Sequence, residues 1–381
     1  DTGFKNLYHP SVSLVLNSPA QMEYENSKGK TEKERLEAGT GLTIQPGDDR
    51  LKYGRIIINP DNPDGVTVTS IERSQGTPVY TGKMEIKECD EGLVLVNDLY
   101  LEDYLTRVVP SEMPPSYEKE ALKAQAVCAR TYAYRQIQGN SYSQYGAHVD
   151  DSTNFQVYNN TQADEKTTQA VKETYGRMLF YEDKPIDAFY FSTSCGRTAD
   201  AGVWGTDPQK YPYLQAVEVK SGRQPLDVGD NDNFDSFIRS RDVTAYDSSY
   251  AMFRWETDIS SDMVSAQING AGAVTDMTIT GRGAGGIASE LSVSGSGGTV
   301  TVKGQGAIRS ALGNPGIVIT KQDGKTMEGS ATLPSAFISI EKRTGEDGKP
   351  SFHIYGGGFG HGVGMSQNGA QGMAKEGKDY E

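Results

Sequence analysis

The amino-acid sequence predicts a mixed α+β fold, and three observations carry that prediction. Short apolar runs separated by turn residues fill residues 53–97, which is typical of strands joined in hairpins. A segment without proline or glycine extends from Ser116 to Gln138 and stops before Gly139, as a long helix does. Near the other end, residues 355–367 read YGGGFGHGVGMSQ, a row of glycines. We therefore expect a β-rich N-terminal part, a core with a central helix, and a groove lined by these glycines.

Length and charge limit the possible functions. A domain averages about 150 residues, so 381 residues fit two domains or one large one. The 37 basic and 51 acidic residues give a net charge of −14, which argues against a nucleic-acid-binding protein. No apolar stretch approaches the roughly 18 residues that a membrane helix needs. Three distant cysteines do not indicate a disulfide framework, and a start at Asp1 without Met leads us to expect a processed or trimmed chain.

The N-terminal part is expected to consist of strands. The first fifty residues are polar and rich in turns, and we expect an irregular segment there that leans toward β structure. Beyond them, the apolar runs Ile56–Ile58, Val66–Ile71 and Leu93–Val96 are the expected strands of hairpins.

The long helix has a face that we expect to be buried. Four apolar residues recur at spacings of four, three and four, and share a narrow arc: Leu122, Ala126, Ala129 and Ala133. Lys123 and Arg130 lie beside this arc, about 20° apart and roughly 10 Å apart along the axis. The two cations therefore share one flank of the helix, either as a solvated surface or as part of a site.

The remainder of the chain alternates between helix, hairpin and loop signals. A second helix is expected over residues 163–174, followed by a hairpin with strands 178–181 and 186–191. Residues 221–235 are polar and are expected to form a loop. Residues 279–302 are rich in glycine and serine but alternate with apolar residues, so we expect glycine-tipped hairpins there.

The glycine row has a regular spacing. Glycines recur at every second position from 356 to 364, so an extended backbone would have one face without side chains, while Phe359 and His361 point the other way. A bulky ligand or another chain fits on such a face. The row has neither the register of a dinucleotide-binding loop nor a G-K-[ST] sequence. The alternative is a tight structural turn, which explains one or two glycines.

Glu112 is the candidate acid. It lies between Ser111 and the prolines at 114 and 115, just ahead of the helix that carries Lys123 and Arg130. A carboxyl held by a proline-stiffened backbone at a helix entrance, with two cations following, suits an acid that acts on a polar substrate. The alternative is a solvated acid or a helix-entry charge.

Two other kinds of site need consideration. Cys195 and His361 allow a cysteine nucleophile with a histidine base, although a cysteine after an apolar strand is more often a buried thiol. His148, Asp150 and Asp151 form the densest cluster of metal-ligand types, and an oxygen-rich loop accounts for them.

Several motifs together resemble the stage II sporulation protein D family. They are LEDYLTRVVPSEMPPSYEKEALKAQAVCARTYAYR from Leu101, DSTNFQVY from Asp151, FSTSCGRT from Phe191, YLQAVE from Tyr213 and GGGFGHGVGMSQNGAQGMA from Gly356. The resemblance spans about residues 80–381. We therefore divide the chain into a β-leaning region 1–80 and a family domain 81–381, with a β-rich part at 220–345.

The resemblance implies a function and a set of residues. Members of the family are lytic transglycosylases that cleave peptidoglycan glycan strands, with a preference for strands without stem peptides, and related amidase enhancers share the domain. It implies that Glu112 is the catalytic acid and base. It also implies that Lys123 and Arg130 match important basic positions, and we expect both, with His361 and Gln367, to bind the substrate. The glycine-lined groove is expected to bring Glu112 and His361 together.

One acid suffices for this chemistry because the sugar supplies the nucleophile. Protonated Glu112 would give its proton to the glycosidic oxygen between N-acetylmuramic acid and N-acetylglucosamine, while the muramoyl C6 hydroxyl closes onto C1. We expect an apolar environment that raises the pKa of Glu112 against the opposing effect of nearby cations.

The resemblance also leads to expectations about metals, partners and location. Asp150, Asn154 and Phe155 stand where some relatives have zinc ligands, so we expect no zinc and no cofactor. The expected partner is the glycan strand outside the cytoplasmic membrane, and a cell-wall amidase is a second one. The alternatives are a noncatalytic wall-binding amidase enhancer and a cysteine hydrolase that uses Cys195. We also expect the family domain to continue briefly beyond Glu381.

Overall fold

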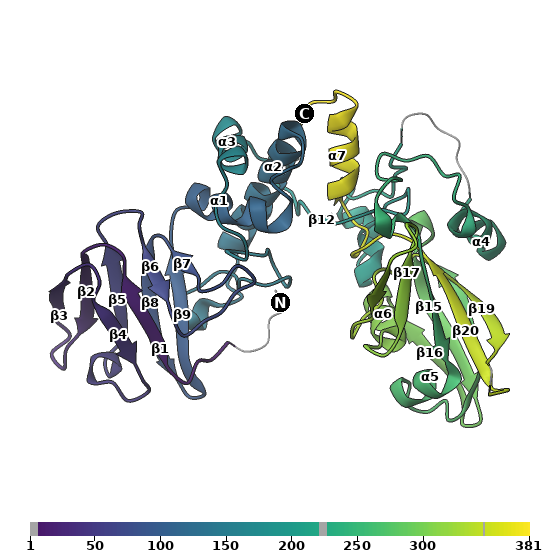
Figure 1. Ribbon diagram of the computed structural model, residues 1–381, viewed down its shortest axis with the longest axis horizontal. Coiled ribbons are helices and arrows are strands. Elements are labelled where there is room, and N and C mark those ends of the chain that lie inside the picture. The colour runs from purple at the N-terminus through teal and green to yellow at the C-terminus, as the bar shows by residue number, and fades with distance from the viewer. Residues whose placement is uncertain (1–6, 221–226, 346) are drawn as a thin grey trace. The chain divides into compact units, whose positions relative to one another are not determined.

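The computed structural model describes residues 7–220, 227–345 and 347–381 (Figure 1). The chain divides into two compact units, residues 1–187 and residues 188–381. Each unit mixes helices with antiparallel sheets, so the predicted α+β class is confirmed. The region 1–80 that the sequence set apart lies inside the first unit, and the boundary between the units falls elsewhere.

The first unit begins with two antiparallel sheets, ordered β3-β2-β5-β8-β9 and β4-β1-β6-β7. Alternating side chains face the interior, as in β1, where Val12, Leu14 and Leu16 are buried. Residues 12–44 therefore form regular strands, so the β-leaning expectation holds there but the expected irregularity does not; residues 1–6 lie outside the described residues. The strands are β1 (Val12–Leu16), β2 (Ala20–Glu25), β3 (Thr31–Leu36), β4 (Gly41–Ile44), β5 (Arg55–Pro60), β6 (Val66–Val68), β7 (Val79–Tyr80), β8 (Lys83–Cys89) and β9 (Gly92–Asp98).

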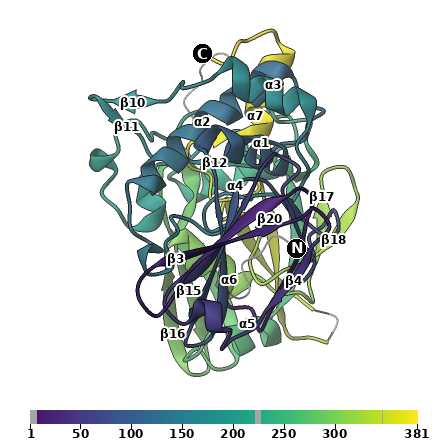
Figure 2. The ribbon, with the colours of Figure 1, turned by 90° about the vertical axis from the view of Figure 1, so that its left-hand side faces the viewer.

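Helices follow the sheets in the first unit. They are α1 (Leu101–Glu112), α2 (Lys119–Ile137), α3 (Glu165–Glu173) and the short 3₁₀ helix η2 (Ser143–Tyr145); another 3₁₀ helix, η1 (Asp49–Leu51), lies between β4 and β5. A small hairpin of β10 (Phe180–Tyr181) and β11 (Lys184–Pro185) projects beyond α2 and α3 (Figure 2). The predicted helices 116–138 and 163–174 are thus present as α2 and α3. All four residues of the predicted apolar arc on α2 are at most 4% exposed.

Helix α1 was not foreseen, because three prolines at positions 110–115 suggested a break. Pro110 lies in its last turns and lacks an amide hydrogen, yet the helix closes with the Met113 N–H donating to the Val109 carbonyl. Glu112 is consequently the last residue of α1. The expectation that it sits at the entrance of the next helix is wrong.

The second unit has its own sheets. A five-stranded antiparallel sheet has the order β18-β17-β13-β20-β19, a three-stranded one has the order β14-β15-β16, and β12 pairs in parallel with β21. The strands are β12 (Tyr190–Phe191), β13 (Trp255–Ser260), β14 (Val274–Arg282), β15 (Ala288–Gly295), β16 (Gly298–Lys303), β17 (Val318–Lys321), β18 (Thr326–Glu328), β19 (Ile338–Thr344), β20 (Pro350–Gly356) and β21 (Met365–Ser366).

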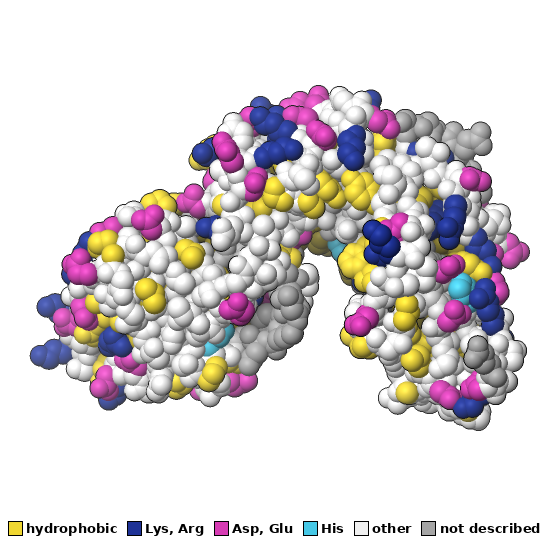
Figure 3. Space-filling model, in the orientation of Figure 1, with side chains coloured by type: hydrophobic (Ala, Val, Ile, Leu, Met, Phe, Trp, Pro, Cys, Tyr) yellow, Lys and Arg dark blue, Asp and Glu magenta, His cyan; other side chains and the backbone are white. Residues whose placement is uncertain are grey.

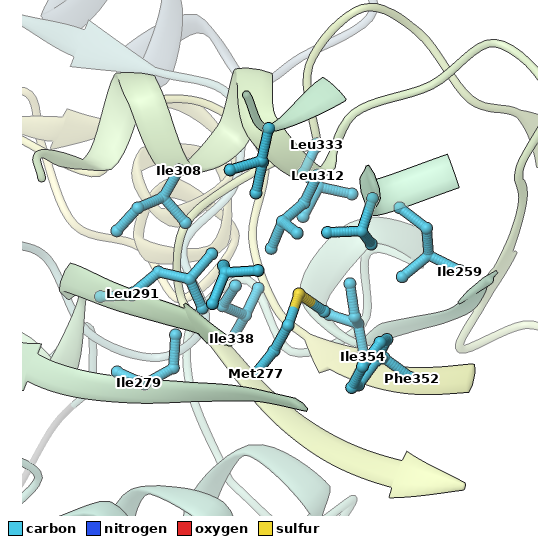
Figure 4. Close-up of a cluster of buried hydrophobic side chains, with 14 of the residues drawn as sticks. Ile259, Met277, Ile279, Leu291, Ile308, Leu312, Leu333, Ile338, Phe352 and Ile354 are labelled. Atoms are coloured by element: carbon cyan, nitrogen blue, oxygen red, sulfur yellow. The ribbon is translucent and has the colours of Figure 1, made fainter. Parts of the chain in front are cut away.

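Two helices of the second unit, α5 and α6, close one apolar core against these sheets, and α4 packs in a second core. Figure 4 shows Ile308 and Leu312 of α6 beside Leu291 of β15 and Ile354 of β20, all buried. The helices are α4 (Asn231–Arg239), α5 (Ser261–Gln267), α6 (Gln305–Leu312), α7 (Gln367–Lys375), and the 3₁₀ helices η3 (Ala201–Trp204), η4 (Pro208–Lys210), η5 (Ala251–Phe253) and η6 (Ala284–Gly286).

Three sequence-based expectations meet different outcomes here. Strands β14, β15 and β16 confirm the hairpins expected over residues 279–302. The loop expected over 221–235 is wrong for its described end, where Asp230 caps α4 and Phe234 is buried; residues 221–226 lie outside the described residues. The strand expected over residues 186–191 is only β12, whose partner is β21.

Within the described residues, no helix is both long and apolar enough to span a membrane. Acidic and basic side chains are interspersed over the visible surface of each unit (Figure 3).

Candidate functional site

The carboxyl of Glu112 is held at the C-terminal end of α1. One of its oxygens accepts the Val157 N–H at 2.7 Å. The loop that presents Val157 is fixed upstream by Asp150, whose carboxylate accepts the Ser152 N–H at 2.9 Å and the Tyr142 hydroxyl at 3.0 Å. The carboxyl-terminal carbonyls of a helix carry partial negative charge, which disfavours a nearby carboxylate. The helix end therefore disfavours the charged form of Glu112, while the hydrogen bond from the Val157 amide favours it.

Two tyrosines, Tyr104 and Tyr132, lie near enough to this carboxyl for its charge to raise their pKa values. The Tyr104 hydroxyl donates to Gln156 at 3.3 Å, and Gln156 in turn donates to the Ala129 carbonyl at 3.2 Å. Burial, followed by the charge of Glu112, raises the pKa of Tyr104 well above its usual value. Burial also raises the pKa of Tyr132 to about 12, with the charges of Asp187, Asp150 and Glu112 adding to it. Both phenols therefore keep their protons at neutral pH.

Arg130 ties three helices together. Its side chain is 1% exposed and makes a two-pronged ion pair with Glu102 of α1 at 2.7 and 2.8 Å. It also donates to the carbonyls of Val171, at 3.1 Å, and Arg177, at 3.1 Å, where α3 ends. A guanidinium suits this position because its fork of donors matches both a carboxylate and unpaired helix-end carbonyls. The structure therefore gives Arg130 a structural task, and its predicted contact with substrate stays a prediction.

Lys123 differs from Arg130 although both lie on one flank of α2. Its ammonium pairs with Glu120 at 2.8 Å and with Glu173 of α3 at 3.0 Å. The hydrogen bonds to Glu120 and Glu173 raise the pKa of Lys123, so it remains charged. Its side chain is 15% exposed, against 1% for Arg130, so Lys123 lies closer to solvent.

The space beside the glycine row of the second unit is filled by other segments of the chain. Gly358, Gly360, Gly362 and Gly364 have positive φ angles between 80° and 114°, so the backbone is not the extended one that the alternation suggested. A side chain at Gly364 would begin 2.1 Å from the Phe189 carbonyl oxygen. At Gly362 it would meet the Phe337 ring at 2.5 Å. The expectation that the bare faces of these glycines line a ligand groove is therefore wrong, because they let neighbouring segments of the chain approach.

His361 lies among aromatic rings at this row. Trp204, Phe191 and Phe189 have ring centroids at 5.4, 5.8 and 6.1 Å from the imidazole. Burial, with a smaller effect from the charge of Arg309, lowers the pKa of His361 to about 4. The Val363 N–H donates to its Nδ1 atom at 3.1 Å, which assigns the ring proton to Nε2. Two aromatic side chains of this region reach solvent, Trp204 at 42% and Phe359 at 40% exposure.

Gln367 begins α7 and is 8% exposed. The preceding Ser366 caps that helix through the Gly369 N–H at 3.1 Å and donates to the buried Asp247 at 2.8 Å. Glu112, Lys123 and Arg130 thus belong to the first unit, and His361 and Gln367 to the second. The prediction that one groove brings Glu112 and His361 together concerns both units and stays a prediction.

The cysteine alternative loses support. Cys195 is 0% exposed, and burial raises the pKa of its thiol to about 11, so the nucleophilic thiolate is scarce at neutral pH. Across residues 7–220, 227–345 and 347–381, no three His, Cys, Asp or Glu side chains gather as metal ligands would. Asp150 is instead engaged by its own loop, and Asp151 pairs with Arg73. The absence of zinc remains an expectation.

The sequence missed the neighbours of Glu112. Tyr104, Tyr132 and Gln156 come from three separate segments, and only folding brings them to the acid. One signal was available: Gln156 and Val157 lie in the DSTNFQVY stretch that matched the family pattern.

Two family models match the chain. Residues 89–181 match the model described as stage II sporulation protein, and residues 200–364 match a domain of unknown function (DUF8618). An uncharacterised protein of Brachyspira hyodysenteriae is 30% identical over 92% of this chain and 82% of its own length.

Two proteins of Bacillus subtilis are also similar. The stage II sporulation protein D is 34% identical over 75% of this chain and 72% of its own length. The amidase enhancer is 30% identical over 72% of this chain but 38% of its own length. The chain therefore belongs to the stage II sporulation protein D family, and this membership supports a cell-wall-related function.

Proposed function

We propose that this protein is a lytic transglycosylase that cleaves peptidoglycan glycan strands outside the cytoplasmic membrane, with Glu112 as its acid and base. The observation that carries the proposal is the setting of Glu112. Its carboxyl is fixed by the Val157 amide at 2.7 Å and lies beside phenols that remain neutral. A carboxyl in such surroundings has a defined position and neutral donors around the site where charge develops.

The reaction needs one proton to move out and one to return. Protonated Glu112 donates its proton to the oxygen of the β-1,4 bond between N-acetylmuramic acid and N-acetylglucosamine, and the C1–O bond breaks. The muramoyl C6 hydroxyl bonds to C1 and loses its proton to the Glu112 carboxylate. The products are a strand with a 1,6-anhydro end and a strand with a free N-acetylglucosamine hydroxyl. No water is consumed, and Glu112 ends protonated as it began.

The remaining predicted residues take supporting parts in this proposal. Arg130 positions α1, and with it Glu112, through its pair with Glu102. Lys123 lies nearer the solvent on the same helix, and we assign it to substrate contact in the first unit. His361 and Gln367 are assigned to substrate contact in the second unit. His361 would act there as a neutral ring, because its pKa of about 4 keeps it uncharged.

The decisive experiment compares products and not only rates. Wild type, Glu112→Gln and Glu118→Gln are incubated with purified peptide-free glycan strands, and the products are analysed by mass spectrometry. Glu118 is an exposed acid that precedes α2, so its replacement controls for the loss of one negative charge. We expect 1,6-anhydro ends from wild type and Glu118→Gln. In Glu112→Gln the rate should fall by about 100- to 10,000-fold, as the loss of a general acid does.

The second candidate function is a noncatalytic amidase enhancer that binds the same strands. The similarity to the Bacillus subtilis amidase enhancer favours it. Under this alternative no anhydro ends form with any variant, the strands still bind, and a purified cell-wall amidase works faster in the presence of the protein. Anhydro ends that depend on Glu112 would eliminate it as the sole function.

A further inference from the structure

A large cavity lies wholly within the first unit. Its volume is about 1050 Å³, at the upper end of the range of small-molecule sites. One wall is formed by β8 and β9, a second by α1 and α2, and a third by residues 142–151. None of the residues proposed above to touch substrate lines it, so its role is separate from that of Glu112.

Tyrosines dominate the lining. Six of them contribute: Tyr8, Tyr80, Tyr104, Tyr142, Tyr145 and Tyr158. Tyr104 and Tyr158 are stacked at a centroid distance of 5.0 Å, while Tyr8 and Tyr145 meet edge to face at 6.2 Å. A tyrosine offers an apolar face and a hydroxyl on a rigid frame. This combination suits a sugar ring, whose C–H face is apolar and whose rim carries hydroxyl and amide groups.

The arginines of the lining are paired with carboxylates of the same lining. Arg55 pairs with Glu85, and Arg73 pairs with Asp151. The Tyr8 hydroxyl lies 2.7 Å from that of Tyr145, and this hydrogen bond, ahead of burial, raises the pKa of Tyr8 to about 12. An anion would have to compete with Glu85 or Asp151 for its cation. The lining therefore favours an uncharged ligand.

The cavity connects to the acid through Tyr104. The ring of this residue lines the cavity, and its hydroxyl donates to Gln156, next to the Val157 amide that holds Glu112. A ligand in the cavity thus lies against the far side of the group that positions the acid.

We propose that this cavity binds an uncharged N-acetylated sugar, the N-acetylglucosamine unit of the glycan strand. The identity of the strand rests on the proposed function. The two sugars of the strand differ in charge, because N-acetylmuramic acid without a peptide carries a lactyl carboxylate and N-acetylglucosamine carries no charge. Only the second matches a cavity whose cations are already paired.

The test measures binding of N,N′-diacetylchitobiose to the full chain by calorimetry. Tyr145→Ala removes one aromatic wall, and Ala147→Trp fills the space without removing a polar group. Both should weaken binding by about tenfold or more, which corresponds to about 1.4 kcal/mol. Tyr175→Ala is the matched control, because Tyr175 is 73% exposed and does not line the cavity. A thermal unfolding midpoint equal to that of the wild type shows that each variant is folded.

Several results would overturn the inference. They are equal chitobiose affinity in wild type and both cavity variants, no chitobiose binding to the wild type, or preferential binding of the free lactyl form of N-acetylmuramic acid. Parallel cleavage assays keep the two proposals apart. Chitobiose binding that needs Tyr145, without any anhydro product, would remove the proposed reaction and leave the sugar site. Glu112-dependent cleavage with unchanged chitobiose binding in both variants would remove the sugar site and leave the reaction.

Discussion

The surroundings of Glu112 in the first unit and the glycine row of the second unit are built in contrasting ways. Around Glu112 the chain assembles polar groups with neutral hydroxyls, and a backbone amide holds the carboxyl at 2.7 Å. Along the glycine row it removes side chains so that its own segments can pass closely, as at Gly364 beside Phe189. In this protein the repeated glycine spacing therefore indicates close packing of the backbone. Glu112 belongs to no repeating pattern, yet it is the residue with the hydrogen-bonding surroundings that catalysis needs.

Replacing Arg130 removes the ion pair that links α2 to the helix that ends at Glu112. Arg130→Ala leaves Glu102 without its buried partner and the end of α3 without donors, so we expect a loss of about 3–5 kcal/mol in unfolding free energy. Lys123→Ala, on the same flank but nearer solvent, should cost about 0–1 kcal/mol. Chemical denaturation followed by circular dichroism measures both.

The two variants also separate structure from substrate contact. Arg130→Lys keeps the charge but not the fork of donors, so it should recover only part of the lost stability. Similar stability of Arg130→Ala and Lys123→Ala, together with a raised KM for Arg130→Ala alone, would contradict the structural task given to Arg130.

In the second unit, Gly364 of the glycine row and Gly377 after α7 share a backbone conformation but differ in their surroundings. Gly364 and Gly377 have φ angles of 80° and 83°, but a side chain at Gly364 meets a carbonyl oxygen at 2.1 Å, and one at Gly377 meets nothing within 4 Å. Alanine at Gly377 should cost about 1–2 kcal/mol for the left-handed backbone alone. Alanine at Gly364 adds the clash with Phe189 and should cost about 2–5 kcal/mol.

Thermal unfolding of the two alanine variants measures this difference. Equal destabilisation would show that backbone conformation alone explains the glycine, and that the close approach of Phe189 contributes nothing. A stable Gly364→Ala variant with impaired glycan binding would restore the interpretation of the row as a ligand surface.

How much the sequence predicts depends on whether a signal is local. The apolar arc of α2 follows from the spacing of Leu122, Ala126, Ala129 and Ala133, because helix geometry alone decides which side chains share a face. Helix α1 was hidden because Pro110 lies inside it, and proline lacks the N–H that an interior helix position donates.

The candidate site shows the same division. The motif around Glu112 identifies the acid, but its partner Val157 is 45 residues away, and the ties of Arg130 join segments up to 47 residues apart. The alternation of glycines predicted a bare extended face, which holds only if the backbone is extended. Positive φ angles, set by the approach of β12 and Phe337, could not be read from spacing.

Burial of His361 should make the free energy of unfolding depend on pH. Its pKa of about 4 in the folded chain lies below the ordinary value of 6.5, because burial disfavours the charged ring. Between these values the unfolded chain binds a proton that the folded chain does not, so stability is fully present above pH 6.5 and falls as the pH drops toward 4. The loss should reach about 3 kcal/mol.

Urea denaturation at several pH values measures this slope for wild type and His361→Asn. The variant has no imidazole at this position, so the difference between the two curves isolates the contribution of His361. A difference that does not change between pH 4 and 7 would contradict a buried neutral ring, and an imidazole resonance that titrates near 6.5 would do the same.

The smallest expected effect comes from Cys195, the second candidate nucleophile. Its sulfur is 0% exposed, its pKa is about 11, and a side chain built at Gly357 would lie 2.8 Å from its Cβ atom, so it is a packed thiol in the core beside the glycine row. Cys195→Ala should keep glycan cleavage within about twofold of wild type, with a loss of about 1 kcal/mol in stability from the missing sulfur. If folded Cys195→Ala lost cleavage while Glu112→Gln retained it, Cys195 and not Glu112 would be the catalytic residue, and the chemistry would belong to the second unit.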